Sequence, residues 1–114
     1  MKGARYVPRR GDIVWITLNP QAGHEQAGRR PAVVLSPETY NAKVGLALFC
    51  PLTSRVKGYP WEVLLPDSLP IAGAVLADQV KSLDWRVRLV EKAAALPPAV
   101  VSEIIGKLGT LLRA

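Results

Sequence analysis

The sequence predicts a mainly β domain: a small, curved antiparallel sheet or barrel followed by one C-terminal amphipathic helix. Three observations support this class. Short runs rich in β-branched and aromatic residues are separated by turns that hold many of the 10 prolines and 9 glycines. After Pro97 the hydrophobic pattern changes from the period of a strand to that of a helix. The length of 114 residues suits a single domain over residues 1–114.

The first half begins with a predicted strand at residues 12–18, where β-branched and aromatic side chains predominate. A long connection follows at residues 19–29, and loops of this length in small domains are often functional. The second strand is expected at residues 31–36, because Pro31 at a strand's first position forfeits no ladder hydrogen bond. Residues 37–44 are expected to form a turn or a single helical turn.

The remaining strands alternate with short turns. They are expected at residues 46–53, 61–65, 73–77, 79–83 and 87–90. Trp61 and Val63 alternate with Glu62, which is the period of a half-buried strand. A bend at Ala77 and Asp78 leaves one or two strands in that part of the chain.

The C-terminal segment has the period of a helix. Its apolar residues fall on one face: Val100, Val101, Ile104, Ile105, Leu108, Leu111 and Leu112. Pro98 suits the first turn, where its missing N–H costs nothing. Gly106 and Gly109 weaken the helix by up to about 1 kcal/mol each, and their small size favours close packing. We therefore expect this helix to contribute to a two-fold homodimer.

Positive charge is concentrated in the first half of the chain. The formal net charge is +6; residues 1–57 carry nine basic and three acidic side chains, whereas residues 58–114 carry six of each. This asymmetry is typical of a protein whose first half engages an acidic or polyanionic partner. By itself, the charge fits a soluble basic protein equally well.

The single cysteine and single histidine exclude several chemistries. Cys50 has no partner for an internal disulfide, and with His24 alone the chain holds neither a His pair nor a Cys/His zinc site. We expect Cys50 to be a buried apolar residue; a Cys50–His24 nucleophile pair is the alternative. The longest charge-free run, residues 13–24, is shorter than the about 20 residues of a bilayer helix. With no secretory signal visible, the expected location is the cytoplasm.

Two polar clusters have the composition of a phosphate- or RNA-binding site. The first, residues 23–31, holds Glu25 close to Arg29 and Arg30. An arginine fork suits phosphate oxygens, and a carboxylate can accept a proton. The same residues also fit a solvated loop with a surface ion pair.

The second cluster, residues 53–61, combines hydroxyl groups with the cations Arg55 and Lys57 and the rings of Tyr59 and Trp61. Single-stranded nucleic acid binding requires cations that track the backbone and rings that stack on bases. The rings fit strand-end core positions equally well. Polar members of residues 77–82 would line a groove.

Four blocks of the sequence follow one another: residues 11–15 (GDIVW), residues 25–36 (EQAGRRPAVVLS), Thr53 with residues 57–60 (KGYP), and residues 76–82 (LADQVKS). Together they closely resemble the MazF/PemK family of toxin endoribonucleases, and the resemblance extends over nearly the whole chain. The E-Q-x-G-x-R-P core is specific to that family.

The resemblance implies an SH3-like antiparallel barrel of the CcdB/MazF type with a C-terminal helix. It also implies a type II toxin that, as a homodimer, cuts single-stranded mRNA at short sequences and so inhibits translation and growth. No metal or other cofactor is expected, and the products are a 2′,3′-cyclic phosphate and a 5′-hydroxyl. A cognate antitoxin would lay an extended, acidic C-terminal segment across the RNA groove.

The resemblance assigns catalytic roles to three residues. Arg30 falls on the family's catalytic arginine and would clamp the charge of the phosphorane. Thr53 falls on its catalytic threonine and would hold a non-bridging oxygen. Glu25 falls on its loop glutamate and would act as base or orienter. His24 departs from the family, since many members carry serine there; an auxiliary proton carrier is one role for it.

Four residues are expected to bind the substrate. Gln79 falls on the family's substrate-binding glutamine. Arg55, Lys57 and Gln26 complete the set.

Two other functions fit a barrel of this kind. A gyrase poison of the CcdB type shares the expected fold, but its toxicity depends on a Trp-Gly-Ile C-terminus, and this sequence ends Leu-Leu-Arg-Ala. A catalytically inactive nucleic-acid-binding or regulatory barrel is the other. Retention of Glu25, Arg30 and Thr53 together with Gln79 argues against it.

Overall fold

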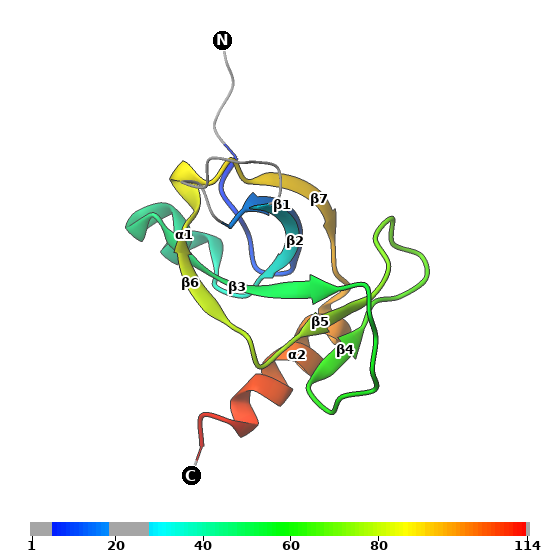
Figure 1. Cartoon of the computed structure of the whole chain (residues 1–114). Helices are drawn as coiled ribbons and strands as arrows, with labels where there is room; N and C mark the ends of the chain where they lie inside the picture. Colours follow the sequence, from blue (N-terminus) through cyan, green and yellow to red (C-terminus); the bar gives the residue numbers. More distant parts are fainter. Residues whose placement is uncertain (1–5, 19–27, 114) are drawn as a thin grey trace.

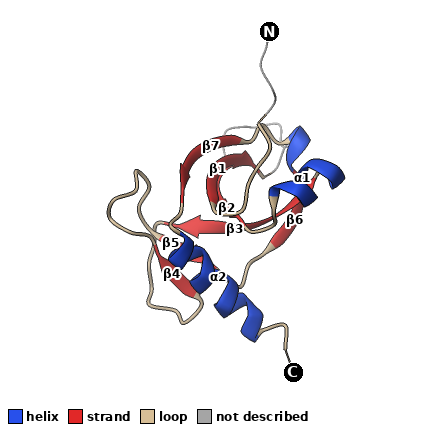
Figure 2. Cartoon of the chain, turned by 180° about the vertical axis from the view of Figure 1, so that it is seen from behind, coloured by secondary structure: helices blue, strands red, loops and turns tan. Residues whose placement is uncertain are grey.

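The computed structural model describes residues 6–18 and 28–113, which fold into a curved, seven-stranded sheet with two α-helices (Figure 1, Figure 2). The elements are β1 (Asp12–Thr17), β2 (Arg29–Val34), α1 (Glu38–Val44), β3 (Leu46–Thr53), β4 (Glu62–Leu64), β5 (Ala74–Leu76), β6 (Lys81–Asp84), the 3-10 helix η2 (Trp85–Val87), β7 (Glu91–Ala95) and α2 (Pro98–Thr110). The strand order is β4-β5-β3-β2-β1-β7, and β6 pairs with β3. Every pair in this part of the chain is antiparallel. The expected mainly antiparallel fold with a C-terminal helix is confirmed.

One side of β3 faces two strands in succession, β6 and then β5. Phe49 faces Lys81 of β6, and Leu52 faces Val75 of β5. Two residues separate Phe49 from Leu52, whereas five separate Val75 from Lys81 on the facing side. The surplus residues leave the ladder, and residues 77–80 form a loop beside the end of β3. We call it the 77–80 loop.

Both faces of the sheet are buried at its central strands. Ile13 and Val33 belong to a core cluster that includes Ile104 of α2, and Val14 belongs to a second cluster that includes Trp85 of η2. Neighbouring residues of a strand point to opposite faces. Strands that are buried on both faces therefore read as continuous apolar runs, as they do in this sequence.

Helix α1 is longer than the expected single turn. It has seven residues and ends at Gly45, whose φ of 84° is in the left-handed region that favours glycine. The buried Asn41 donates hydrogen bonds to the backbone carbonyls of Pro8 (2.8 Å) and Ser36 (3.0 Å). This polar anchor gives no hydrophobic signal in the sequence.

The prediction of a strand at residues 87–90 is wrong. Helix η2 occupies the start of that segment, and the chain then turns through Leu89, whose φ is 53°. The strand comes later, as β7, and pairs with β1. Its sequence, EKAAA, favours helix, but pairing with the open edge of β1 overrides that preference.

Helix α2 confirms the predicted amphipathic helix, with Ile104 fully buried against the sheet. Its glycines do not pack against the sheet. A Cβ at Gly106 would meet open space, and one at Gly109 would meet only the side chain of Arg113. Within residues 6–18 and 28–113, no helix is long and apolar enough to cross a bilayer.

Candidate functional site

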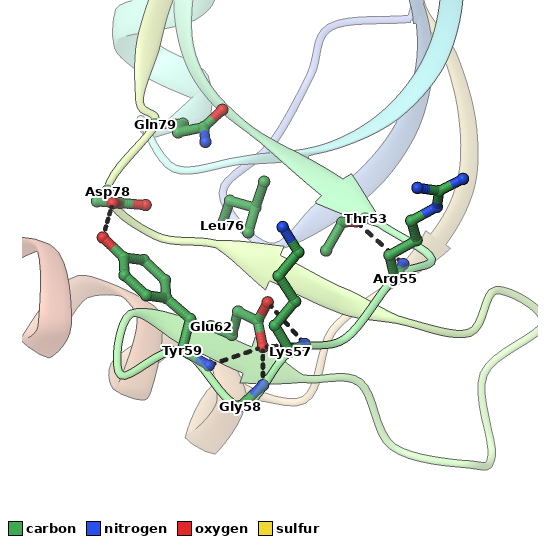
Figure 3. Close-up of a pocket in the computed structure, with 9 residues that line it drawn as sticks. All are labelled: Thr53, Arg55, Lys57, Gly58, Tyr59, Glu62, Leu76, Asp78 and Gln79. Carbon is green, nitrogen blue, oxygen red and sulfur yellow. Dashed lines mark hydrogen bonds between the residues drawn. The ribbon is translucent and has the colours of Figure 1, made fainter.

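A groove of about 430 Å³ opens where the end of β3 meets two loops (Figure 3). One is the 77–80 loop; the other, which we call the 55–60 loop, joins β3 to β4. The lining residues are Thr53, Arg55, Lys57, Gly58, Tyr59, Glu62, Leu76, Asp78 and Gln79. The groove thus brings together four of the seven residues that the sequence assigns to a site: Thr53, Arg55, Lys57 and Gln79.

Thr53 is the last residue of β3. Its hydroxyl oxygen accepts a hydrogen bond from the backbone N–H of Arg55 at 3.1 Å, a local bond typical of a chain leaving a strand. Gly73 approaches the Thr53 backbone closely: a Cβ at Gly73 would lie 2.2 Å from the Thr53 carbonyl oxygen, and the φ of Gly73 is +125°. Glycine is therefore required at this position, and its close approach helps to fix the end of β3.

Arg30 lies on β2, is exposed, and is not among the residues that line the groove. β2 pairs with β3 so that Ala32 faces Pro51. Continued two residues toward the start of β2, this register sets Arg30 opposite Thr53, and opposed residues share a face of a sheet. Opposed Cα atoms lie about 4.5–5.5 Å apart. The long Arg30 side chain can therefore reach a phosphate held at Thr53.

Glu25 and Gln26, the other two residues assigned to the site, lie outside the described residues, as does His24. Their roles stay predictions.

Glu62, at the start of β4, is a lining residue that the sequence did not single out. Its side chain accepts hydrogen bonds from the backbone N–H groups of Lys57, Gly58 and Tyr59, at 2.9–3.2 Å (Figure 3). The residue is only 8% exposed. In the sequence it is an acidic residue after a basic loop, which does not by itself distinguish it from a surface residue.

A second contact joins the two loops across the groove. The Tyr59 hydroxyl donates to Oδ2 of Asp78 at 2.7 Å, and this bond is the main cause of a raised pKa of Tyr59. The other oxygen of Asp78, Oδ1, is buried and has no hydrogen-bond partner among the described residues. Neither residue was assigned to the site from the sequence, although both stood within the polar clusters noted there.

Cys50 lies beneath this region and is fully buried. Burial, with a smaller contribution from the nearby charge of Asp78, raises the pKa of the Cys50 thiol to about 12. The thiol is therefore protonated at neutral pH and is not a nucleophile. The expectation of a buried apolar residue is confirmed.

Two arginines anchor the strand ends that flank residues 19–27, through hydrogen bonds to backbone carbonyls. Arg88 donates to the backbone carbonyls of Thr17 (3.1 Å) and Leu18 (2.7 Å). Arg29 donates to the carbonyl of Leu89 at 2.7 Å. These bonds tie the end of β1 and the start of β2 to the turn before β7, so Arg29 has a structural task next to Arg30.

Only part of the positive charge of the first half lies at the groove. Arg9 pairs with Glu38 at 3.4 Å on α1, and Arg29 pairs with Glu91 at 3.1 Å on β7. The groove lining itself holds two cations and two carboxylates. The formal charge of the lining is therefore zero.

Comparison with known proteins identifies the family. The family described as "PemK-like, MazF-like toxin of type II toxin-antitoxin system" matches residues 9–112. The endoribonuclease toxin MazF of Escherichia coli K12 is 47% identical over 109 residues, which cover 96% of this chain and 97% of that relative. The endoribonuclease PemK of Escherichia coli is 32% identical and covers 90% of this chain and 80% of its own length.

Solved structures agree in sequence and fold. Crystal structures of MazF (Form-I) and of a MazE–MazF complex (Form-II), both from Deinococcus radiodurans, superpose with TM-scores of 0.85 each. The first is 57% identical and covers 95% of this chain and 98% of that one; the second is 51% identical and covers 95% and 97%. Since the family match extends from before β1 to beyond α2, the chain belongs to the PemK-like, MazF-like toxins of type II toxin–antitoxin systems.

Proposed function

We propose that the chain is a toxin endoribonuclease that cuts single-stranded mRNA at short sequences, without a metal ion. The observation that carries the proposal is one groove lined by Thr53, Arg55, Lys57 and Gln79. Continuing the β2–β3 register by two residues sets Arg30 opposite Thr53, which supports it. The names of the relatives, an endoribonuclease toxin and an endoribonuclease, support the class of reaction. Residues 1–114 act as one domain, in the cytoplasm where mRNA is translated.

The groove suits an unpaired strand. Tyr59 is 45% exposed, and its ring lies 5.8 Å from that of Trp61 at an interplanar angle of 49°. An exposed ring next to cations is the arrangement on which a base stacks while the backbone is tracked by positive charge. A duplex offers no free base faces to such rings, so single-stranded RNA is the favoured substrate.

The nucleophile is the 2′-hydroxyl of the RNA itself. Its oxygen bonds to the adjacent phosphorus while the bond from phosphorus to the 5′-oxygen breaks, which yields a 2′,3′-cyclic phosphate and a 5′-hydroxyl. A base takes the 2′ proton, and the 5′-oxygen gains one. Arg30 stabilises the extra negative charge of the phosphorane. The Thr53 hydroxyl holds a non-bridging oxygen.

Neither of the two carboxylates that line the groove offers an accessible, unengaged oxygen as the base. Glu62 accepts hydrogen bonds from backbone N–H groups. Oδ2 of Asp78 accepts one from Tyr59, and its Oδ1 is buried. This supports Glu25, the glutamate of the E-Q-x-G-x-R-P block, as the base, since the ordinary pKa of a glutamate leaves it ionised at neutral pH.

The test is digestion of a long RNA of defined sequence in the presence of EDTA, with the new 5′ ends mapped. Cuts are expected at one short recurring sequence, and the new ends should accept phosphate from polynucleotide kinase without prior dephosphorylation. Intact RNA, or cleavage that requires Mg²⁺, would contradict the proposal. Inhibition of DNA gyrase without RNA cleavage would instead favour a gyrase poison.

The proposed assembly is a homodimer. Apolar side chains near the end of α2 stay exposed in the single chain: Ile105 by 41%, Leu111 by 51% and Leu112 by 75%. Exposed apolar side chains of this size are typical of a surface that a second subunit covers. Sedimentation should give twice the chain mass of 12.3 kDa; a monomer at micromolar concentration would contradict this assembly.

The proposed protein partner is an antitoxin with an extended, acidic C-terminal segment that occupies the RNA groove. A solved relative is a MazE–MazF complex, which supports the existence of such a partner. A non-cleavable RNA and the acidic peptide should exclude each other. With Arg30, Arg55 and Lys57 as phosphate contacts, the slope of log affinity against log salt for RNA should be about −2. Simultaneous binding, or affinities indifferent to salt, would refute a shared groove.

A further inference from the structure

We propose that Glu62 is a positioning residue that holds the 55–60 loop in its RNA-binding shape. The proposal rests on the proposed function, because it concerns the same groove. Glu62 is acidic and lies beside a site for a polyanion, so its charge opposes binding of the substrate. The geometry points to a structural role that explains why an unfavourable charge is present here.

Three successive backbone N–H groups converge on one oxygen. Oε1 of Glu62 accepts from Lys57 at 3.1 Å, Gly58 at 2.9 Å and Tyr59 at 3.2 Å. The φ of Gly58 is +78°, a conformation in which successive N–H groups can point to one side. Such concave sets of N–H groups bind anions in other proteins. Here the anion is the chain's own carboxylate.

The loop side of this contact carries the groups that face the groove. Figure 3 shows the Lys57 side chain rising from the loop toward the space between Thr53 and Leu76, and the Tyr59 ring reaching Asp78. Released from Glu62, the three N–H groups would be free to turn toward water. The loop would then sample many shapes, and ordering it would subtract from the free energy of RNA binding.

The Glu62 side of the contact is fixed independently. Its backbone pairs with Leu76 in the sheet, and its carbonyl accepts from Nζ of Lys107 on α2 at 3.0 Å. The indole N–H of Trp61 donates back to the Lys107 carbonyl at 3.0 Å. Glu62 therefore stands on a frame of strand and helix, and the loop is the part that it holds.

Shape and charge can be separated experimentally because Oε1 carries most of the contact. Oε2 accepts only a second, 3.2 Å bond from Lys57. In Glu62→Gln the amide oxygen can take the place of Oε1 and keep all three N–H partners without the negative charge. In Glu62→Ala all of these bonds are lost. Glu38→Gln, on α1 and in an exposed pair with Arg9, is the matched control for removal of one carboxylate charge.

The experiment measures kcat and KM on an RNA oligonucleotide that contains the mapped cleavage sequence. Glu62→Ala is expected to lose about 10–100-fold in kcat/KM, the size of effect that follows displacement of positioning groups. Glu62→Gln should keep most of kcat and lower KM by roughly two- to fivefold, because a like charge near the substrate is removed. Loss of kcat in Glu62→Gln equal to that in Glu62→Ala would overturn the proposal, since it would mean that the charge itself takes part in the reaction.

A second readout does not depend on RNA cleavage. Trypsin cuts after arginine and lysine, and Arg55 and Lys57 lie in the loop. Native Glu62→Ala should be cut after Lys57 much faster than the wild type, whereas Glu62→Gln and Glu38→Gln should resist. Equal resistance of all four proteins would overturn the proposal even if the wild type cleaves RNA. If the wild type cleaves no RNA, the proposed function fails, while the trypsin pattern still tests whether Glu62 holds the loop.

Discussion

The two loops that flank the groove are held in different ways. Glu62 holds the 55–60 loop from beneath, with a buried carboxylate that accepts three successive backbone N–H groups. The 77–80 loop exists because β3 pairs out of step with β5 and β6, and its hydrogen bond to the opposite loop is the exposed one between Tyr59 and Asp78.

This difference assigns unequal stiffness to the two sides of the groove. Side chain-to-backbone bonds at a buried carboxylate are shielded from water and are costly to break. The Tyr59–Asp78 bond exchanges readily with water, and it leaves Oδ1 of Asp78 buried without a partner among the described residues. We therefore expect the groove to widen on the side of the 77–80 loop, while the side of the 55–60 loop keeps its shape.

The largest effect should come from the proposed catalytic centre at the end of β3. Arg30→Ala removes the main positive charge opposite Thr53 and should lower the cleavage rate by about 10²–10³, the usual result of deleting one electrostatic donor. The circular dichroism spectrum should not change, because Arg30 is exposed. Arg9→Ala, which removes an exposed arginine near α1, is the control. Normal cleavage by Arg30→Ala would contradict the assignment of Arg30 as the group that stabilises the phosphorane.

A smaller effect, on the stability of the fold, should follow from a substitution at Gly73, which contacts the end of β3 at the groove. Gly73→Ala places a Cβ against the Thr53 carbonyl at a φ of +125°. The free energy of unfolding should fall by about 2–4 kcal/mol, as measured by urea denaturation. Gly106→Ala is the matched control, since its Cβ meets open space on α2, and it should gain about 0.5–1 kcal/mol. Equal changes in the two variants would mean that the end of β3 is not fixed by this contact.

The smallest effect should come from the exposed contact between the loops. Tyr59→Phe should raise KM for RNA by roughly two- to fivefold and leave kcat nearly unchanged, which is less than Glu62→Ala is expected to lose. A larger loss in Tyr59→Phe than in Glu62→Ala would reverse the assigned order of stiffness.

The pH dependence of stability tests the exposed hydrogen bond between the two loops. The pKa of Tyr59 is raised above its ordinary 10.0, mainly by the hydrogen bond to Asp78. The bond therefore contributes fully to stability below pH 10 and is lost as the pH rises through the raised value. Urea denaturation of the wild type and Tyr59→Phe should differ by a constant amount up to about pH 9, and the difference should shrink in more alkaline solution. A difference that grows with pH would contradict this assignment.

Much of the fold could be predicted because it follows from local pattern. The strand at residues 46–53 was placed with its observed bounds, and β1 and α2 were placed to within a few residues. β7 was not, because its alanines favour helix and only pairing with β1, far away in the sequence, makes the segment a strand. Long-range pairing of this kind leaves no periodic signal in the segment itself.

The site residues also divide into those that the sequence predicted and one, Glu62, that it did not. The resemblance assigned Thr53 and Gln79, the basic cluster pointed to Arg55 and Lys57, and the structure places all four at one groove. Glu62 was assigned only to a strand, because an acidic residue after a basic loop has the composition of an ordinary surface. Its role depends on three backbone N–H groups, which any residue type except proline supplies and which no sequence pattern marks.

The mismatch along β3 has a consequence for how this protein can diversify. Because β5 and β6 are each anchored to β3 by their own ladders, the chain between the buried Ala77 and the half-buried Val80, which holds Asp78 and Gln79, can change in length without shifting either strand. Insertions there would alter the rim of the groove and leave intact the core cluster to which Ala77 belongs. A library that varies only the length and side chains at these two positions is thus a direct route to new cleavage sequences, since its members should fold like the parent and differ chiefly in which RNA they accept.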